Sequence, residues 1–270
     1  MAPPPLVDGH CHVHDPRLES SIEHVLQRAI EVDVLYLCSC GCHPEDWSRL
    51  VQLMEKHHQS PVTILPSFGY HPWWANVYED ESLLRDMLLR FPTAGLGEIG
   101  LCKSSRGQQI TLNEQMRVFQ AQFELGIELK RTMTIHCVGY HGQLLSYLQQ
   151  QYRTHGATIP SVILHSFSGS FELMRDYAKL SKHIYFSFSV KQICTNAKVQ
   201  RMLPRVPVTQ LMLETDAPDQ SLDRPPSLNE PSNIQKSLEY ITIQNCYPSL
   251  TKAGLAEQLQ RNASTAFTIK

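Results

Sequence analysis

Short apolar runs typical of strands alternate along this chain with longer segments of helical period. The segment 44–58, for example, places Trp47, Leu50, Val51 and Met54 on one helical face, as an amphipathic helix does. Strands that alternate with helices of this length indicate βαβ units and a parallel sheet. The strand-like runs cover residues 6–12, 33–40, 62–72, 93–101, 132–137, 161–167, 183–190 and 210–218. The helical segments between them cover residues 20–32, 44–58, 81–91, 111–130, 141–153, 170–182 and 195–203, and two more close the chain.

The number of these units decides between an open sheet and a barrel. Eight strand–helix units in about 250 residues fit a closed (β/α)8 barrel better than an open sheet. We therefore predict an α/β protein with a TIM barrel fold, formed by one domain over residues 1–270. The segment richest in helix and strand breakers is residues 216–231, "DAPDQSLDRPPSLNEP", which we expect to form a long loop after the eighth strand.

Composition narrows the class of protein. The chain is 42% hydrophobic and 19% charged with a formal net charge of −2, so no broad basic surface for duplex nucleic acid is expected. A phosphate-bearing substrate would have to be held locally, by bound cations. No apolar run approaches the roughly 20 residues of a membrane span, and the opening residues lack the pattern of a secretory signal. The eight cysteines show no disulfide framework, so we expect reduced thiols and a protein of the cytoplasm or the nucleus.

Residues of metal-ligand type fall at the ends of the predicted strands. In a barrel the C-terminal ends of the strands meet at one rim, which carries the active site. Histidines two apart on a strand point the same way and can chelate one ion. Any one of these residues alone has an ordinary explanation, such as a salt bridge or a satisfied polar side chain. Together they predict one metal site that suits zinc, manganese, iron or magnesium, formed by His10, His12, Glu98, His136, His165 and Asp216.

Two neighbouring features carry weaker signals. His14 follows the first-strand histidines but lies nearer the loop, so we expect it behind the ligands or in solvent. The segment "CSCGCH" at 38–43 places Cys38, Cys40 and Cys42 on one strand face. Zinc knuckles use two-residue gaps between cysteines, so we predict buried free thiols here in preference to a structural zinc.

With these residues in place, the sequence closely resembles the TatD family of metal-dependent deoxyribonucleases in the amidohydrolase superfamily, almost from end to end. The motifs that carry the resemblance occur in the family's order: "VDGHCH", "GYHP", "GEIGL", "TIH", "LHSFSG", "LETDAP", "NEPSN" and "NASTAF".

The resemblance implies a role for each matched residue. His10, His12 and Asp216 would hold a first divalent ion, and Glu98 would bridge to a second. His136 and His165 would complete the second site, so two ions of magnesium, manganese or zinc are expected. His71 would approach the substrate phosphate, and the reaction would be hydrolysis of DNA phosphodiester bonds, often from the 3′ end.

Within that implied reaction, the residues themselves suggest further roles. Two cations about 3.5–4 Å apart can clamp a phosphodiester and activate a water. Asp216 is our candidate for taking the proton of that water, and Glu98 suits a bridge because a carboxylate has two oxygens. Trp73 and Trp74 follow His71 and either stack on a terminal base or only cover the mouth of the barrel.

Three positions depart from the family pattern. Cys102 stands where an aspartate is common, and Val138 and Leu228 stand where arginines are common. These departures remove two cations and one carboxylate from the expected mouth, but none of the expected metal ligands. They keep two alternatives open, which are a hydrolase of a small-molecule amide, lactone or phosphoester, and a scaffold that has lost activity. We expect a monomer by default, single-stranded DNA or DNA ends as partner, and no membrane.

Overall fold

The computed structural model describes residues 4–224 and 226–269 and places eight parallel strands in the order β1 to β8. Each strand pairs with the next one along the chain. Backbone hydrogen bonds from Asp216 N to His10 O (2.9 Å) and from His12 N to Ala217 O (2.6 Å) join the two outer strands. The strands are β1 (Leu6–Cys11), β2 (Val34–Gly41), β3 (Thr63–Phe68), β4 (Gly95–Cys102), β5 (Met133–Val138), β6 (Val162–Leu164), β7 (Ile184–Ser189) and β8 (Leu211–Glu214). The ring is therefore nearly closed, and the predicted TIM barrel is confirmed.

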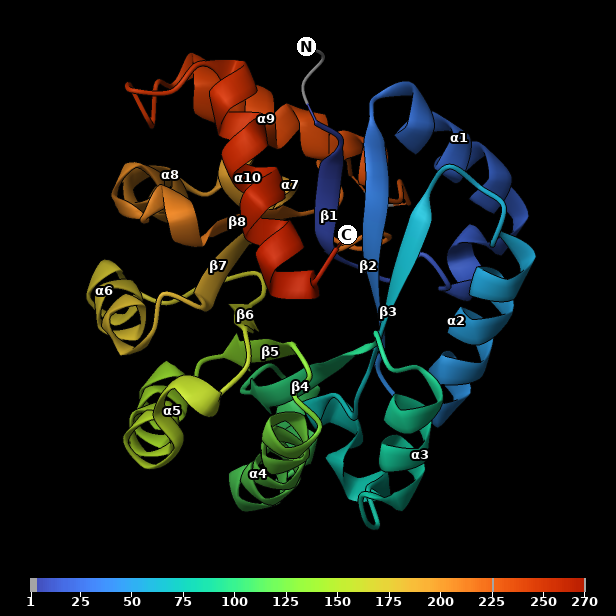
Figure 1. The fold of residues 1–270 in the computed structure, drawn as a ribbon, viewed down its shortest axis with the longest axis vertical. Helices are drawn as coiled ribbons and strands as arrows, with labels where there is room; N and C mark the ends of the chain where they lie inside the picture. Colours follow the sequence, from blue (N-terminus) through green and yellow to red (C-terminus); the bar gives the residue numbers. More distant parts are fainter. Residues whose placement is uncertain (1–3, 225, 270) are drawn as a thin grey trace.

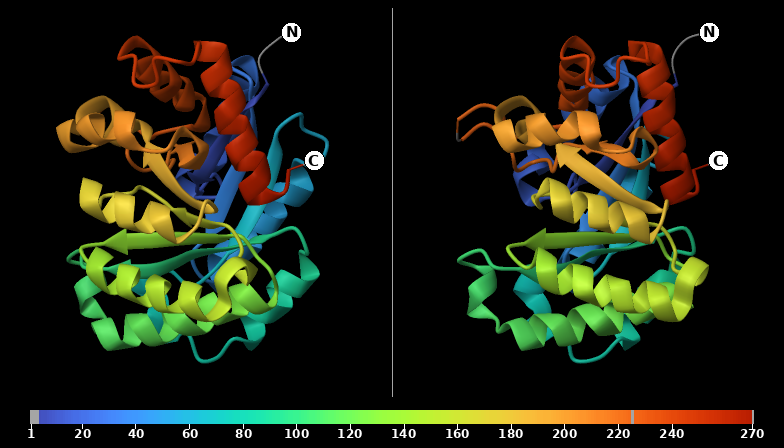
Figure 2. Two further views of the ribbon diagram at one scale, coloured as in Figure 1. Left: turned by 60° about the vertical axis from the view of Figure 1, so that its left-hand side comes forward. Right: turned by 90° about the vertical axis from the view of Figure 1, so that its left-hand side faces the viewer.

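Helices form a layer outside the strands (Figures 1 and 2). They turn one apolar face inward, as α1 does by burying Ile22, Val25, Leu26 and Ala29 at helical spacing. No helix among residues 4–224 and 226–269 combines the length and the apolar character that crossing a membrane requires. The α-helices are α1 (Ile22–Glu31), α2 (Pro44–Lys56), α3 (Ser82–Arg90), α4 (Leu112–Glu128), α5 (His141–His155), α6 (Phe171–Leu180), α7 (Val190–Thr195), α8 (Ala197–Met202), α9 (Ile234–Ile243) and α10 (Lys252–Phe267).

The last helix, α10, has a different place from the others. It crosses the ring beside β1 and β8 in Figure 1. Its Ala263 and Ala266 pack against Val7, Ile163 and Met212, which come from three strands. The barrel is thus covered by α10 at the end opposite the carboxyl ends of the strands, which leaves that carboxyl rim as the accessible end.

Two details differ from the elements that the sequence predicts. The short helix α7 follows β7 directly, because Ser189 and Gln192 form a reciprocal cap at its start. The predicted strands 161–167 and 210–218 are longer than β6 and β8, so His165 and Asp216 follow their strands, whereas Glu98 and His136 lie inside β4 and β5. The β4–β5 register shifts between Leu96 and Ile99, and such an irregularity re-aims the side chains beside it.

Candidate metal centre

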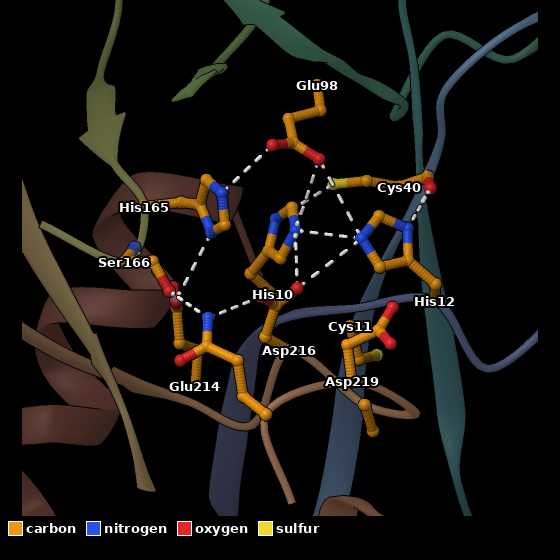
Figure 3. A network of polar contacts seen from close by, with 12 residues as sticks. His10, Cys11, His12, Cys40, Glu98, His165, Ser166, Glu214, Asp216 and Asp219 are labelled. Carbon is orange, nitrogen blue, oxygen red and sulfur yellow. Dashed lines mark hydrogen bonds and ion pairs between the residues drawn. The ribbon is translucent and has the colours of Figure 1, made fainter. Parts of the chain in front are cut away.

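The structure brings all of the predicted ligands together at the carboxyl rim of the barrel. The side chains of His10, His12, Glu98, His165 and Asp216 converge in Figure 3. Among the described residues, four groups of possible ligands each have their ligand atoms within 4.8 Å of one another, and these groups are His10–His12–Asp216, His10–Glu98–His165, His71–Glu98–His136 and His12–Cys42–Glu98. Residues more than 200 positions apart therefore share one cluster, as strand order around a barrel predicts.

Glu98 lies at the centre of the cluster, and its two carboxylate oxygens face different partners. Oε1 lies 2.7 Å from His136 Nδ1 and 2.9 Å from His165 Nε2. Oε2 lies 3.5 Å from His10 Nε2 and 3.7 Å from His12 Nε2. The side chain is only 4% exposed. One carboxylate thus separates two sets of nitrogen donors.

The hydrogen bonds of His12 and His165 fix which ring nitrogen each presents. His12 Nδ1 donates to the carbonyl of Cys40 at 2.7 Å, and a carbonyl can only accept. His165 Nδ1 donates to Glu214 Oε1 at 3.2 Å. In the neutral rings, Nε2 therefore keeps its lone pair and faces the cluster. This pattern is typical of metal-binding histidines, whose other nitrogen is held by a carboxylate or carbonyl.

The His10–His12 pair also fits a cation. Their Nε2 atoms lie 3.2 Å apart, and both lie 3.5 Å from Asp216 Oδ1. Two ring nitrogens this close to one another and to a carboxylate oxygen can share a positive ion held between the three atoms. The donor set of imidazoles and carboxylates is one that divalent metals accept.

Asp216 is held in place by two sets of contacts. Its Oδ2 accepts a hydrogen bond from Gln220 Nε2 at 2.5 Å. The preceding Thr215 donates from its backbone N (2.9 Å) and from Oγ1 (2.5 Å) to Asp8, which is fully buried in β1. Burial raises the pKa of Asp8 to about 8, although the hydrogen bonds from Thr215 oppose the rise. Asp8 therefore braces the turn that carries Asp216.

The electrostatics of the cluster favour positive charge at its centre. Burial alone would raise the pKa of Glu98, but the imidazoles of His165 and His71 hold it well below its usual value. Burial would lower the pKa of His165, but Glu98 and Glu214 raise it well above its usual value. Burial lowers the pKa of His10 to about 4, so its ring is neutral at physiological pH. Ionised carboxylates and a neutral imidazole are the forms that bind a metal.

His71 and Trp73 lie at the edge of this cluster. His71 Nδ1 accepts a hydrogen bond from the backbone N of Trp73 at 3.1 Å. In the neutral ring Nε2 then carries the proton, and it lies 3.5 Å from Glu98 Oε1. His71 thus presents a donor and not a lone pair, which suits contact with a phosphate oxygen better than with a metal. The guanidinium of Arg106 lies 4.4 Å from the ring centroid of Trp73 and 5.1 Å from that of Trp74.

A cavity of about 350 Å³ opens above the cluster. Cys137, Val138 and Trp73 give it an apolar wall, and Asp219 and Gln220 lie on the opposite loop. No lysine or arginine is among the described residues that line it. Val138 is 37% exposed in this lining. The position where the family commonly has an arginine therefore carries no cation here.

Several residues of the site do not follow from the ligand pattern alone. Glu214, fully buried, accepts hydrogen bonds from His165 and Ser166, and its place two residues before Asp216 in "LETDAP" is the signal that could have indicated it. His14 is buried behind His12 with Nδ1 3.0 Å from Ser39 Oγ, so it lies in the layer behind the ligands.

A TIM barrel with buried histidines and carboxylates converging at its carboxyl rim defines a metal-dependent hydrolase of the barrel class. Residues 7–268 match the model of the family described as TatD related DNase, so the chain belongs to this family. The resemblance noted in the sequence is thereby confirmed.

Individual relatives agree with this assignment. The chain is 28% identical over 248 residues to the human protein named deoxyribonuclease TATDN3, covering 87% of this chain and 86% of the relative. It is 26% identical over 222 residues to a protein of Escherichia coli named uncharacterized metal-dependent hydrolase YjjV, covering 80% and 81%. The crystal structure of YjjV shares the fold with a TM-score of 0.84 at 23% identity, over 98% of both chains. The predicted enzyme class, a metal-dependent hydrolase, is confirmed by this family and these relatives.

Proposed function

We propose that this protein is a divalent-metal-dependent deoxyribonuclease that hydrolyses DNA phosphodiester bonds from a 3′ end, using a water activated between two ions. The observation that carries the proposal is the position of Glu98, whose two oxygens face separate sets of donors. The family match and the names of the relatives supply the substrate class.

In this proposal each ion would have its own ligands. His10, His12 and Asp216 would hold one, His136 and His165 would hold the other, and Glu98 would contribute to both. Two such cations, when bound, clamp the phosphodiester and lower the pKa of an attacking water. Magnesium, manganese and zinc all accept this mixture of nitrogen and oxygen donors.

The protein side chains orient the substrate and move the proton. Asp216 Oδ1 faces the His10–His12 side, and it is the group we assign to accept the proton of the water. Gln220 fixes the rotation of that carboxylate through Oδ2. His71 Nε2 donates a hydrogen bond to a phosphate oxygen. Trp73 closes the mouth beside His71 and contacts the nucleotide at the scissile bond, with Arg106 already on the ring.

The test is a nuclease assay on end-labelled single-stranded and duplex DNA, with metal-stripped protein and with added magnesium, manganese or zinc. Products shortened stepwise from the 3′ end are expected only with metal. Glu98→Ala and Asp216→Ala, purified in the same way, exclude a contaminating nuclease. If folded protein with normal metal content releases nothing from any DNA, the proposal is wrong.

A second candidate function has one specific observation in its favour. The described lining of the 350 Å³ cavity contains no lysine or arginine, and the carboxylate of Asp219 at its edge is paired with Arg17 at 2.9 Å. Such a mouth suits a small substrate of low negative charge, such as an amide, a lactone or a phosphoester, better than a polyanion. Measuring the hydrolysis of a panel of such amides, lactones and phosphoesters distinguishes this function from that of a nuclease. RNA belongs in the same panel because a human relative, 30% identical over 56% of this chain, is named 3′-5′ RNA nuclease TATDN2. The cytoplasmic location and the monomeric state stay predictions.

A further inference from the structure

We propose that Cys42 is a ligand of the ion on the His10–His12 side, which gives that site a sulfur donor and a preference for zinc over magnesium. This inference rests on the metal centre proposed above. It adds to that centre a residue that the family-derived ligand set does not include.

The geometry places the thiol at the cluster. Cys42 Sγ lies 3.8 Å from Glu98 Oε2, the oxygen that faces His10 and His12. Cys42 Sγ, an oxygen of Glu98 and a ring nitrogen of His12 all lie within 4.8 Å of one another, and Sγ lies 4.0 Å from His12 Nδ1, the nitrogen that donates to the carbonyl of Cys40. His10, His12, Asp216 and Glu98 already give that ion four donors, so the sulfur would be a fifth. An oxygen and a sulfur on one zinc are about 3.0–3.5 Å apart, given bond lengths of about 2.0 and 2.3 Å. The 3.8 Å separation of Cys42 Sγ and Glu98 Oε2 would therefore have to shorten by about 0.3–0.8 Å.

The neighbouring cysteines do not have this position. Cys40 is fully buried, and its Sγ lies 3.4 Å from His10 Nδ1, whereas His10 Nε2 is the atom that faces Glu98 and Asp216. Cys38 is also buried, and its carbonyl accepts a hydrogen bond from the thiol of Cys11. Cys42 follows the last residue of β2 and is half-buried, so it reaches the rim where the other two do not. It also lines the cavity above the cluster.

The chemistry of sulfur decides which ion is favoured. Thiolates are soft ligands that select zinc, whereas magnesium takes oxygen donors in a nearly octahedral shell. On binding, the S–H bond of Cys42 breaks, a zinc–sulfur bond forms, and the proton passes to solvent. The family-derived donors alone, four imidazoles and two carboxylates, leave the choice among zinc, manganese and magnesium open. A thiolate among them shifts that choice towards zinc.

The first experiment reads the sulfur–metal bond directly. Metal-stripped protein is titrated with Co²⁺, and a sulfur-to-cobalt charge-transfer band is followed in the near ultraviolet. The band is expected in the unmodified protein and in Cys194→Ser, which removes a half-buried thiol of α7 outside the cluster. It is expected to vanish in Cys42→Ser, while the weak visible bands of bound cobalt remain. Zinc affinity of Cys42→Ser is expected to fall by at least about tenfold, and magnesium affinity to change far less.

A second measurement needs no variant. Alkylation of Cys42 by iodoacetamide, located by peptide mass spectrometry, is expected to be blocked by zinc and not by magnesium. Visible cobalt bands without the near-ultraviolet band, or alkylation that zinc does not slow, would overturn the assignment of Cys42 and leave the metal centre intact. Protein that binds no cobalt or zinc at all would overturn both this inference and the proposed function.

Discussion

The metal cluster and the 350 Å³ cavity above it differ in how many polar contacts hold their side chains in place. In the cluster, several ligands are held by hydrogen bonds from behind, as Glu214 holds His165 and the carbonyl of Cys40 holds His12. In the cavity above it, Val138 is 37% exposed, and no described lining residue is a lysine or arginine. The contacts that position the ligands are therefore present, whereas the nearby cations lie outside the lining, where Arg17 contacts Asp219, Lys198 contacts Ser168 and Arg106 contacts Trp73. Catalytic chemistry and substrate affinity are thus separable here, and variants can address each in turn.

The largest effect is expected from Asp216→Asn. The amide keeps the size of the side chain but cannot accept a proton as the carboxylate does, so kcat is expected to fall by roughly 10²–10⁴-fold. Steady-state kinetics with metal content measured on the same samples test this. Asp219→Asn is the matched control, since Asp219 lies at the cavity edge and is 59% exposed. Unchanged kcat in Asp216→Asn with full metal content would remove Asp216 from the proton transfer.

A smaller effect is expected behind the ligands, in Glu214→Gln. Glu214 accepts from His165 Nδ1 at 3.2 Å and from the backbone N of Ser166 at 2.8 Å. The neutral amide stabilises the histidine ligand less, so metal affinity is expected to drop by about 10–100-fold. Competition with a chromogenic chelator measures it, with the exposed Glu128→Gln of α4 as control. Equal metal affinity in Glu214→Gln and Glu128→Gln would show that metal binding does not depend on the hydrogen bond that His165 donates to Glu214.

The tight packing beneath the cluster predicts a stability effect at Gly100. This residue has a φ of +140°, and a Cβ there would lie 2.0 Å from the carbonyl oxygen of His136. Gly100→Ala is expected to lower the free energy of unfolding by about 1–3 kcal/mol from backbone strain, before any clash is counted. Denaturant titration measures the change. Gly142→Ala, at an open position of α5, is expected to be neutral or stabilising, and equal destabilisation by both would contradict this account.

The smallest effect concerns the mouth, in Val138→Arg. A cation at this lining position is expected to add one contact to phosphate. The slope of log affinity for single-stranded DNA against log salt concentration should then steepen by about 0.7. Fluorescence anisotropy across a salt series measures it, and Val138→Gln supplies a long neutral side chain as control. An unchanged slope in the arginine variant would mean that DNA does not pass this wall of the cavity, which favours the small-substrate alternative.

Prediction from the sequence succeeded where the signal was local and periodic. The alternation of apolar runs and amphipathic segments gave eight strands and the barrel, because each βαβ unit carries its own pattern. It placed the carboxyl ends of β4 and β5 within one residue, but it made the sixth and eighth strands too long, since β6 ends at Leu164 and β8 at Glu214. It also missed α7, whose reciprocal cap is a side-chain contact.

Residue type and order along the chain were enough to indicate the barrel and the chemistry at its rim, because strand ends in a parallel barrel meet whatever the loops between them do. They could not indicate that Glu98 divides its oxygens between two donor sets, that Cys42 reaches Oε2, or that Arg106 covers Trp73. Those relations depend on distances between elements far apart in the chain, and only packing of the whole barrel fixes them.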